Sequence, residues 1–327
     1  MEKKQFIEIR EALRQAMDEE MTRDPTVFIL GEEVAEYNGA YKVTKGLLAK
    51  WGPERVIDTP ISENGFTGLA IGAAQTGLRP VVEFMSWNFS FVAFDQLVSN
   101  AAKAHYMSGG RFSVPIVFRG PNGAAAQVSC QHSHNVEAIY GHFPGFIVIS
   151  PSNAYDAKGL LKSAIRSNNP VLFLENELTY NDKMEIPTEE YLVPIGKAKV
   201  IKEGKDITLI SYSRTLKFCL EAANELTKQG VSVEVIDLRT IKPLDIATIT
   251  TSVRKTHRCV LVEEGHIFAG ISAELGFQIQ EHCFDDLDAP LVRVCSRETP
   301  LPYSKPLELE TLPNKGRIMN AISDTLR

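Results

Sequence analysis

The chain has 327 residues, of which 44% are hydrophobic and 23% are charged, and its formal net charge is −6. This is the composition of a globular protein long enough for two domains with cores of their own, and the negative balance gives no electrostatic case for binding nucleic acid. The five cysteines are scattered without a CxxC pair, which predicts free thiols in a reducing compartment and neither a zinc site nor a disulfide framework.

The first twenty residues, MEKKQFIEIREALRQAMDEE, contain no apolar run followed by a cleavage site, and they are too acidic for a transit peptide. No window of the chain has the length of uninterrupted apolar sequence that a membrane span needs. We therefore expect a soluble, cytoplasmic protein with no membrane partner.

The first half of the chain alternates helical and strand-like segments. A helix that ends at Asp24-Pro25 is predicted by apolar residues at helical spacing, namely Phe6, Ile9, Leu13, Ala16 and Met17. Short apolar runs bounded by Gly, Pro or Asn follow: TVFIL, PVVEFM, VPIVFRGP, GFIVIS and PVLFLEN. Continuous apolar runs of this length are typical of parallel strands buried on both faces. Helical patterns lie between them, in FVAFDQLVSNAAKAH and AYDAKGLLKSAIRS.

A polar, proline-containing stretch interrupts this alternation at 179–196, and the strand and helix pattern then starts again at DITLISYS. Because strand and helix alternate in both halves, we predict the α/β class with two doubly wound domains. The predicted domains are 1–180 and 196–327, joined by a linker at 181–195.

Familiar catalytic motifs are missing from the sequence: there is no GxxxxGK[ST], no GxGxxG after a strand, no GxSxG and no HExxH. In the segment QHSH, His132 and His134 would share one face of an extended chain, but no third ligand has a natural spacing. We therefore predict no zinc site there, and we interpret His134 as a polar loop residue.

The stretch DTPISENGF (58–66) places a single carboxylate, Glu63, at the entrance of a helix rich in small residues. Small residues let another backbone or a ligand approach closely. From the residues alone two interpretations stay open. Glu63 is either a structural glutamate at a helix start, held by the cap or an ion pair, or a carboxylate that faces a ligand.

Several blocks of sequence, in order along nearly the whole chain, carry a family resemblance. They include GEEVAEYNGAYKVTKGL (31–47), RVIDTPISENGFTGLAIGAA (55–74), EFMSWNFSFVAFDQLVSNAAKAHYMSGG (83–110), VPIVFRGPNG (114–123), QHSHNVEAIYGHFPG (131–145) and DLRTIKPLD (237–245). The chain resembles the beta subunits of the thiamine-dependent first component of 2-oxo acid dehydrogenase complexes, in the transketolase-like family, and among them the pyruvate dehydrogenase branch. The resemblance implies a pyrimidine-binding domain followed by a transketolase C-terminal-like domain.

The resemblance also implies roles for individual residues. Glu63 would face the aminopyrimidine ring of thiamine diphosphate and share a proton with a ring nitrogen, so that it both binds the cofactor and takes part in catalysis. Phe89 would lie against the ring, with plain core packing as the other interpretation, and Met85 and Tyr37 would line the same pocket. His132 would be a catalytic histidine that handles the substrate or the transfer to lipoamide, against a structural histidine bonded to a backbone carbonyl.

A monovalent cation, usually potassium, is a further implication. The matching positions are Ile116, Ala164, Ile165, Ser167 and Asn169, and Ser167 stands where close relatives commonly have aspartate. Most of these ligands would be backbone carbonyls.

The sequence contains no GDG motif, with which thiamine enzymes hold the diphosphate and Mg²⁺. The resemblance therefore implies that an alpha subunit supplies these ligands in an α2β2 heterotetramer. The second domain would serve assembly and docking on the dihydrolipoyl acetyltransferase, with Asp288 as a contact.

The implied activity is oxidative decarboxylation of pyruvate and acetylation of lipoyl groups, which links glycolysis to acetyl-CoA. The alternatives left open are a beta subunit acting on acetoin or branched-chain 2-oxo acids, and an assembly subunit without catalysis.

Overall fold

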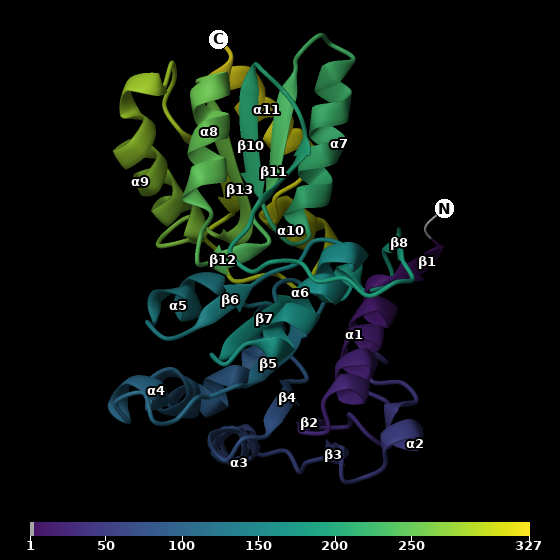
Figure 1. Cartoon of the computed structure of the whole chain (residues 1–327). Coiled ribbons are helices and arrows are strands. Elements are labelled where there is room, and N and C mark those ends of the chain that lie inside the picture. Colours follow the sequence, from purple (N-terminus) through teal and green to yellow (C-terminus); the bar gives the residue numbers. More distant parts are fainter. Residues whose placement is uncertain (1–2) are drawn as a thin grey trace. The chain divides into compact units, whose positions relative to one another are not determined.

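The structure is a computed structural model that describes residues 3–327, and Figure 1 shows the course of the chain. The residues group into two compact units. The first unit comprises the chain up to Asn122 together with Ile139–Ile195, and the second comprises Gly123–Ala138 and Gly196–Arg327. Segment 123–138, which lies within the predicted first domain, therefore groups with the second unit.

Six parallel strands form the sheet of the first unit, in the order β6-β7-β5-β4-β2-β3. They are β2 (Val27–Gly31), β3 (Val56–Asp58), β4 (Arg79–Glu83), β5 (Val117–Pro121), β6 (Ile147–Ile149) and β7 (Val171–Glu175). Every residue of β2, β5 and β7 is buried. The prediction of buried parallel strands from continuous apolar runs is confirmed.

The helices of the first unit are mostly short. They are α1 (Ile9–Arg23), α2 (Leu47–Trp51), α3 (Glu63–Gln75), α4 (Ala104–Met107), α6 (Ala154–Arg166) and, from Ile139 onward, α5 (Glu137–His142). Between β4 and α4 the chain forms a 3₁₀ segment, η1 (Trp87–Ala93), and a π-helical turn, η2 (Gln96–Ala101). The helix predicted over FVAFDQLVSNAAKAH is thus broken into three short pieces, and such interruptions of the α-helical hydrogen-bond pattern are frequent at functional sites.

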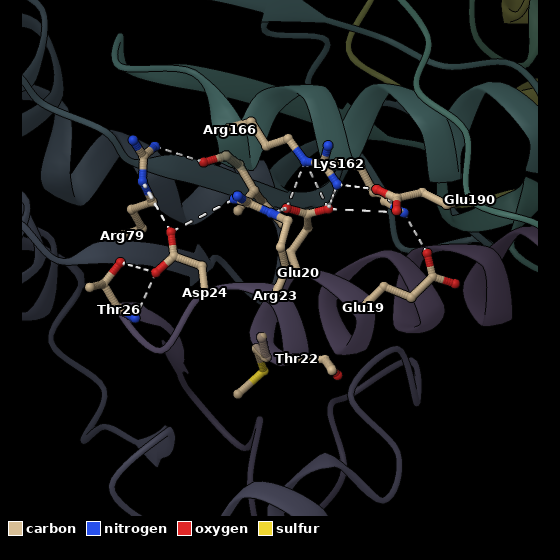
Figure 2. A network of polar contacts seen from close by, with 12 residues as sticks. Glu19, Glu20, Thr22, Arg23, Asp24, Thr26, Arg79, Lys162, Arg166 and Glu190 are labelled. Carbon is tan, nitrogen blue, oxygen red and sulfur yellow. Dashed lines mark hydrogen bonds and ion pairs between the residues drawn. The ribbon is translucent and has the colours of Figure 1, made fainter.

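Helices α1 and α6 pack side by side and are joined by charges, as Figure 2 shows. The carboxylate of Glu20 is fully buried and lies 2.7 Å from Nη2 of Arg166. Nζ of Lys162, which is also buried, lies 2.6 Å from the carboxylate of Glu19. Each buried charge has a partner of opposite sign, which is the condition under which such groups are tolerated in a protein interior.

Strand β1 (Lys4–Glu8) pairs with β8 (Lys183–Pro187) in an antiparallel two-stranded sheet. The structure therefore differs from the sequence prediction at both ends of this pairing. The first helix begins at Ile9, so that Phe6 lies in a strand, and the predicted linker 181–195 contains β8. A distant strand offers the backbone of residues 4–8 a hydrogen-bonding partner, and local periodicity does not report it.

The second unit contains a five-stranded sheet in the order β14-β13-β10-β11-β9. Its strands are β9 (Lys199–Lys202), β10 (Ile207–Ser211), β11 (Val233–Asp237), β13 (Cys259–His266) and β14 (Val292–Ser296), and a short strand, β12 (Thr240–Lys242), follows β11. Strand β9 at the edge is antiparallel to β11, and the other pairs in this sheet are parallel. Together with the sheet of the first unit, this arrangement confirms the predicted α/β class.

Helices cover both faces of this sheet. They are α7 (Thr215–Thr227), α8 (Ile246–Thr256), α9 (Ile271–Cys283), α10 (Lys305–Thr311) and α11 (Lys315–Thr325). Helix α7 packs with α11, and α8 packs with α9 (Figure 1). Three further 3₁₀ turns are η3 (Cys130–His132), η4 (Glu177–Thr179) and η5 (Phe284–Asp286). No helix in the described part of the chain is long and apolar enough to cross a membrane.

Candidate active site

Glu63 is the first residue of α3, and it is only 7% exposed. Its carboxylate makes no hydrogen bond or ion pair with any residue in 3–327. The position suits a negative charge, because the unpaired N–H groups of the first turn carry partial positive charge. A buried carboxylate that has no cation beside it remains available to a ligand that offers a donor.

Glu32 is a second carboxylate at this place, and our sequence analysis missed it. It follows β2 directly and is buried, and its Oε1 accepts no hydrogen bond from the described residues. Burial and the neighbouring negative charge of Glu63 raise the pKa of Glu32 from 4.5 to about 7. The Glu32 carboxyl therefore keeps its proton to higher pH than an exposed glutamate does. Two adjacent glutamates directly after a buried parallel strand were the signal that could have revealed it.

The carboxyl end of β4 is tightly enclosed by its neighbours. A Cβ atom on Gly31 would lie 2.5 Å from the carbonyl oxygen of Glu83, and one on Gly120 would lie 2.2 Å from that of Phe84. Both distances are shorter than van der Waals contact, so glycine is required at these two positions, on the strands that flank β4. The close approach fixes the point from which the next segment, with Met85 and Phe89, leaves the sheet.

Met85 and Phe89 are half-buried residues that follow β4. Phe89 lies on η1, which packs against α3, the helix that begins with Glu63. Trp87 anchors this turn in the core, because its ring centroid lies 5.4 Å from that of Phe84 and 5.5 Å from that of Tyr140. Two of the predicted cofactor contacts, Glu63 and Phe89, thus come from elements that pack together.

Tyr37 lies in the loop that follows β2 and is 56% exposed. Nζ of Lys42 lies 3.2 Å from the centroid of its ring and donates a hydrogen bond of 2.7 Å to its carbonyl oxygen. The ring is therefore held by a cation of the same loop. Its predicted contact with the cofactor stays a prediction.

His132 ends the 3₁₀ turn η3 and is exposed, and His134 follows two residues later. The carbonyl oxygen of His134 accepts a hydrogen bond of 2.9 Å from the N–H of Gly123. Burial and the nearby imidazoles of His132 and His266 lower the pKa of His134. Three imidazoles thus gather in the second unit, yet within residues 3–327 no group of three His, Cys, Asp or Glu side chains could hold a metal ion.

Four of the five predicted cation ligands, Ala164, Ile165, Ser167 and Asn169, lie at or just after the end of α6. The carbonyl oxygens of Ile165 and Ser167 accept hydrogen bonds of 3.0 and 2.9 Å from Nη1 of Arg79. Nη2 of the same guanidinium donates to Oδ1 of Asn168 at 2.6 Å. Figure 2 includes Arg79 beside Asp24. The partial negative charge of this helix end is thus already matched by one cation of the chain itself.

The other predicted cation ligands have backbone partners too. The carbonyl oxygen of Ala164 accepts a hydrogen bond of 3.0 Å from the N–H of Ser167, and that of Ile116 accepts one of 2.9 Å from the N–H of Val171. The N–H of Asn169 donates to Oγ of Ser167 at 3.1 Å. A carbonyl oxygen has two lone pairs, so each can still take one further ligand.

A buried ionic network at the carboxyl ends of β4, β5 and β7 is another feature that sequence reasoning missed. Nη1 of Arg119 donates to Glu83, and Nε donates to Glu175 at 2.5 Å, with all three side chains buried. The hydroxyl of Tyr180 donates to Glu175 at 2.6 Å. Burial raises the pKa of Glu83, although the nearby guanidinium opposes this. The network joins β4, β5 and β7 at their carboxyl ends, the edge of the sheet at which the candidate site lies.

Comparison with known protein families gives two matches. Residues 5–183 match the transketolase pyrimidine-binding domain, and residues 196–318 match the transketolase C-terminal domain. Among solved structures, a split-gene transketolase, described as an inactive beta4 tetramer, superposes with a TM-score of 0.79 over 98% of both chains. Its sequence identity is 21%, so this likeness concerns the fold.

Relatives of known name match the chain over almost its whole length. The pyruvate dehydrogenase E1 component subunit beta of Rickettsia conorii is 54% identical over 316 residues, which are 97% of each chain. The mitochondrial protein of the same name from Bos taurus is 54% identical over 325 residues, covering 98% of this chain and 90% of the relative. The one from Rhizobium meliloti is 51% identical, covering 96% of this chain and 68% of the relative. This chain therefore belongs to the family of pyruvate dehydrogenase E1 component beta subunits, with the two transketolase-type domains that its sequence predicts.

Proposed function

We propose that the chain is the beta half of a thiamine diphosphate-dependent pyruvate dehydrogenase. In this role it takes part in the oxidative decarboxylation of pyruvate and in the transfer of the acetyl group to lipoyl groups of the acyltransferase. The observation that carries the proposal is the buried, unpaired carboxylate of Glu63 beside Glu32, at the start of a helix rich in small residues. The likeness to named relatives over nearly the whole chain supports it.

The residues of this site suit the aminopyrimidine half of the cofactor. Glu63 has no partner of its own, and Oε1 of Glu32 is a buried acceptor without a donor, so both can take part in hydrogen bonds to a polar ring. Thiamine diphosphate, when bound, supplies the electron sink that decarboxylation of a 2-oxo acid requires. The protein supplies binding, orientation and control of protons.

Within this arrangement Glu63 would hold the aminopyrimidine ring of the bound cofactor by sharing a proton with one of its nitrogens. Glu32, whose pKa of about 7 is raised by burial and by Glu63, exchanges a proton readily at neutral pH and supports that sharing. Phe89 offers flat apolar area that orients the ring, with Met85 beside it in sequence, and Tyr37 lies in the loop that carries Glu32. His132 serves the substrate or the lipoyl group, because an exposed imidazole can give or take a proton there.

The alpha subunit supplies the rest of the site in this proposal. The 327 residues contain no GDG motif, so the ligands for the diphosphate and Mg²⁺ come from a second polypeptide, in an α2β2 heterotetramer. The second unit then serves assembly and docking on the acyltransferase. A cytoplasmic location stays a prediction of the sequence.

Potassium at the end of α6 is a separate proposal. Main-chain carbonyls at the C-terminal end of a helix suit a cation, and four of the five predicted ligands, Asn169 included, lie at or just after the end of α6. The guanidinium of Arg79 shares two of the same oxygens, so its charge repels a second cation and weakens the binding. A rise in melting temperature with KCl, against choline chloride at equal ionic strength, is expected to be small and saturable. A flat response would reject the site.

The experiment for the main proposal is coexpression with the alpha subunit encoded in the same genome. The purified complex should reduce an artificial electron acceptor with pyruvate only when thiamine diphosphate and Mg²⁺ are added, and it should acetylate a lipoyl domain. Faster turnover of acetoin or of branched-chain 2-oxo acids would instead assign the chain to a relative of different substrate. An inactive complex, properly assembled, would indicate a subunit without catalysis.

A further inference from the structure

We propose that Asp58 is a positioning residue that holds Glu32 against Glu63, an inference that rests on the proposed function for its catalytic consequence. Asp58 is the last residue of β3, and both of its carboxylate oxygens bond the loop that follows β2. Oδ1 accepts a hydrogen bond of 2.7 Å from the N–H of Ala35, and Oδ2 accepts one of 3.0 Å from the N–H of Glu36. Such charge-assisted bonds are stronger than those between neutral groups.

Asp58 joins the two segments that carry the paired carboxylates. Glu32 lies three residues before Ala35, and Glu63 lies five residues after Asp58, at the start of α3. The N–H of Thr59 also donates to the carbonyl oxygen of Gly31, at 2.9 Å. Three hydrogen bonds between these segments therefore limit how far Glu32 can move from Glu63.

The loop needs such an anchor because its backbone is unusual. Glu33, next to Glu32, has φ of 59°, and Asn38 has φ of 64°. Side-chain-bearing residues rarely adopt this left-handed conformation, and they keep it only where surrounding contacts impose it. Other bonds close the loop on itself, such as the one from the N–H of Gly39 to the carbonyl oxygen of Glu33 at 2.7 Å. The bonds from Asp58 tie this closed loop to the segment of Glu63.

The consequence concerns the proton on Glu32. Coulombic interaction falls with distance and with the entry of water, so a looser loop weakens the effect of Glu63 on Glu32. The raised pKa of Glu32 then falls toward its ordinary value. Any pH limb of activity that reports Glu32 moves to lower pH, whether the active form is the protonated or the ionised one.

The test compares Asp58→Asn with wild type in the complex with the alpha subunit. Asn keeps one acceptor oxygen and turns an amide group toward the other N–H, so one of the two bonds is lost. We expect kcat to fall about tenfold. We also expect the limb of the pH profile that Glu32→Gln abolishes to shift downward by about half a unit or more. A readout independent of turnover is hydrogen exchange of the full chain, in which the amides of residues 33–38 should exchange faster.

The matched control is Asp24→Asn. Asp24 also accepts a backbone N–H, that of Thr26 at 2.9 Å, but at the opposite end of β2. This variant should lower the melting temperature without moving the pH limb. If Asp58→Asn unfolds the chain, Asp58→Glu, which keeps both oxygens one methylene away, replaces it with the same expected direction.

Two results would overturn the proposal. One is unchanged exchange of residues 33–38 in Asp58→Asn. The other is faster amide hydrogen exchange of residues 33–38 while the limb of the pH profile stays at its wild-type position. That combination would make Asp58 only a structural anchor of the loop. Failure of the proposed function is distinguishable, because the wild-type complex would then lack thiamine-dependent turnover while the exchange measurement still reports on Asp58.

Discussion

The carboxylate of Glu63 lies near enough to that of Glu32 to raise its pKa, and neither has a cation beside it among the described residues. Burial and the neighbouring Glu63 together raise the pKa of Glu32. Glu63 thus lacks the lysine or arginine partner typical of a structural glutamate, and this supports its proposed role at the cofactor.

Replacing Glu63 by Gln should abolish nearly all decarboxylation while fold and assembly remain intact. The amide keeps the size of the side chain but cannot share an acidic proton, so a loss of about 100-fold or more in kcat is expected. Turnover of the purified complex with an artificial acceptor measures this, and gel filtration checks assembly. Near wild-type turnover in Glu63→Ala would contradict the assignment.

Glu32→Gln should change how the stability of the chain depends on pH. Below pH 4.5 the carboxyl is protonated in both folded and unfolded states. Between 4.5 and about 7 the unfolded state releases the proton while the folded state keeps it, so the free energy of unfolding falls as pH rises. The variant lacks this penalty and should be more stable than wild type by about 3 kcal/mol at pH 7.5, with almost no gain at pH 4. Urea unfolding of the full chain at both pH values measures the difference in the free energy of unfolding. An equal difference at both pH values would show that it does not come from the raised pKa of Glu32.

Arg119→Leu should destabilise the first unit strongly. The change leaves the carboxylates of Glu83 and Glu175 buried without their cation, and breaking a buried pair in this way costs about 3–5 kcal/mol. The control is Lys50→Leu, which breaks a half-exposed pair with Asp18 and should cost less than about 1 kcal/mol. Similar melting temperatures for the two variants would show that the network contributes little.

His132→Ala should depress the acetylation of a lipoyl domain much more than it lowers the melting temperature. The side chain is exposed, so little packing is lost, whereas a group that exchanges protons with the substrate is removed. His134→Gln serves as the neighbouring control. A large loss of melting temperature with activity per folded molecule unchanged would favour a structural histidine.

Asp288→Asn should weaken binding of the complex to the acyltransferase, most clearly at low ionic strength. The side chain of Asp288 is 55% exposed and lies 3.4 Å from Nη1 of Arg258, so it remains accessible to a basic partner. Complementary charges mainly raise association rates, and salt screens them. Glu225→Gln, an exposed change on α7, is the control in surface plasmon resonance at two salt concentrations. Equal affinities of Asp288→Asn and wild type at low salt would show that Asp288 is an ordinary solvated residue with no role in docking.

Local patterns predicted the buried elements of this fold well. The runs at 27–31, 117–121 and 171–175 are strands because apolar residues on both faces fit only the centre of a parallel sheet. The first helix was predicted three residues too early, because residues 4–8 pair with a strand about 180 positions later in the chain. Edge strand β9 runs antiparallel, and no periodicity within four residues reports the direction of a neighbour.

From the sequence, only those residues of the candidate site could be predicted that stand out from their immediate neighbours. Glu63 is conspicuous because it stands alone before a run of small residues. The raised pKa of Glu32 depends on a neighbour 31 positions away, and the bonds of Asp58 reach 22 and 23 positions back. Arg79 likewise meets the end of α6 more than 80 positions later. Such relations come from tertiary structure and leave no trace in local spacing.

The pairing of β1 with β8 bears on how the chain folds during synthesis. Residues 4–8 meet their partners only at residues 183–187, and α1 meets its packing partner α6 only at 154–166. At about 5–20 residues per second, the ribosome exposes the apolar face of α1 for roughly ten seconds or more before these segments emerge. Strand β1 and helix α1 therefore cannot pack until β8 and α6 have been synthesised, and during that time chaperones can bind the exposed apolar face of α1.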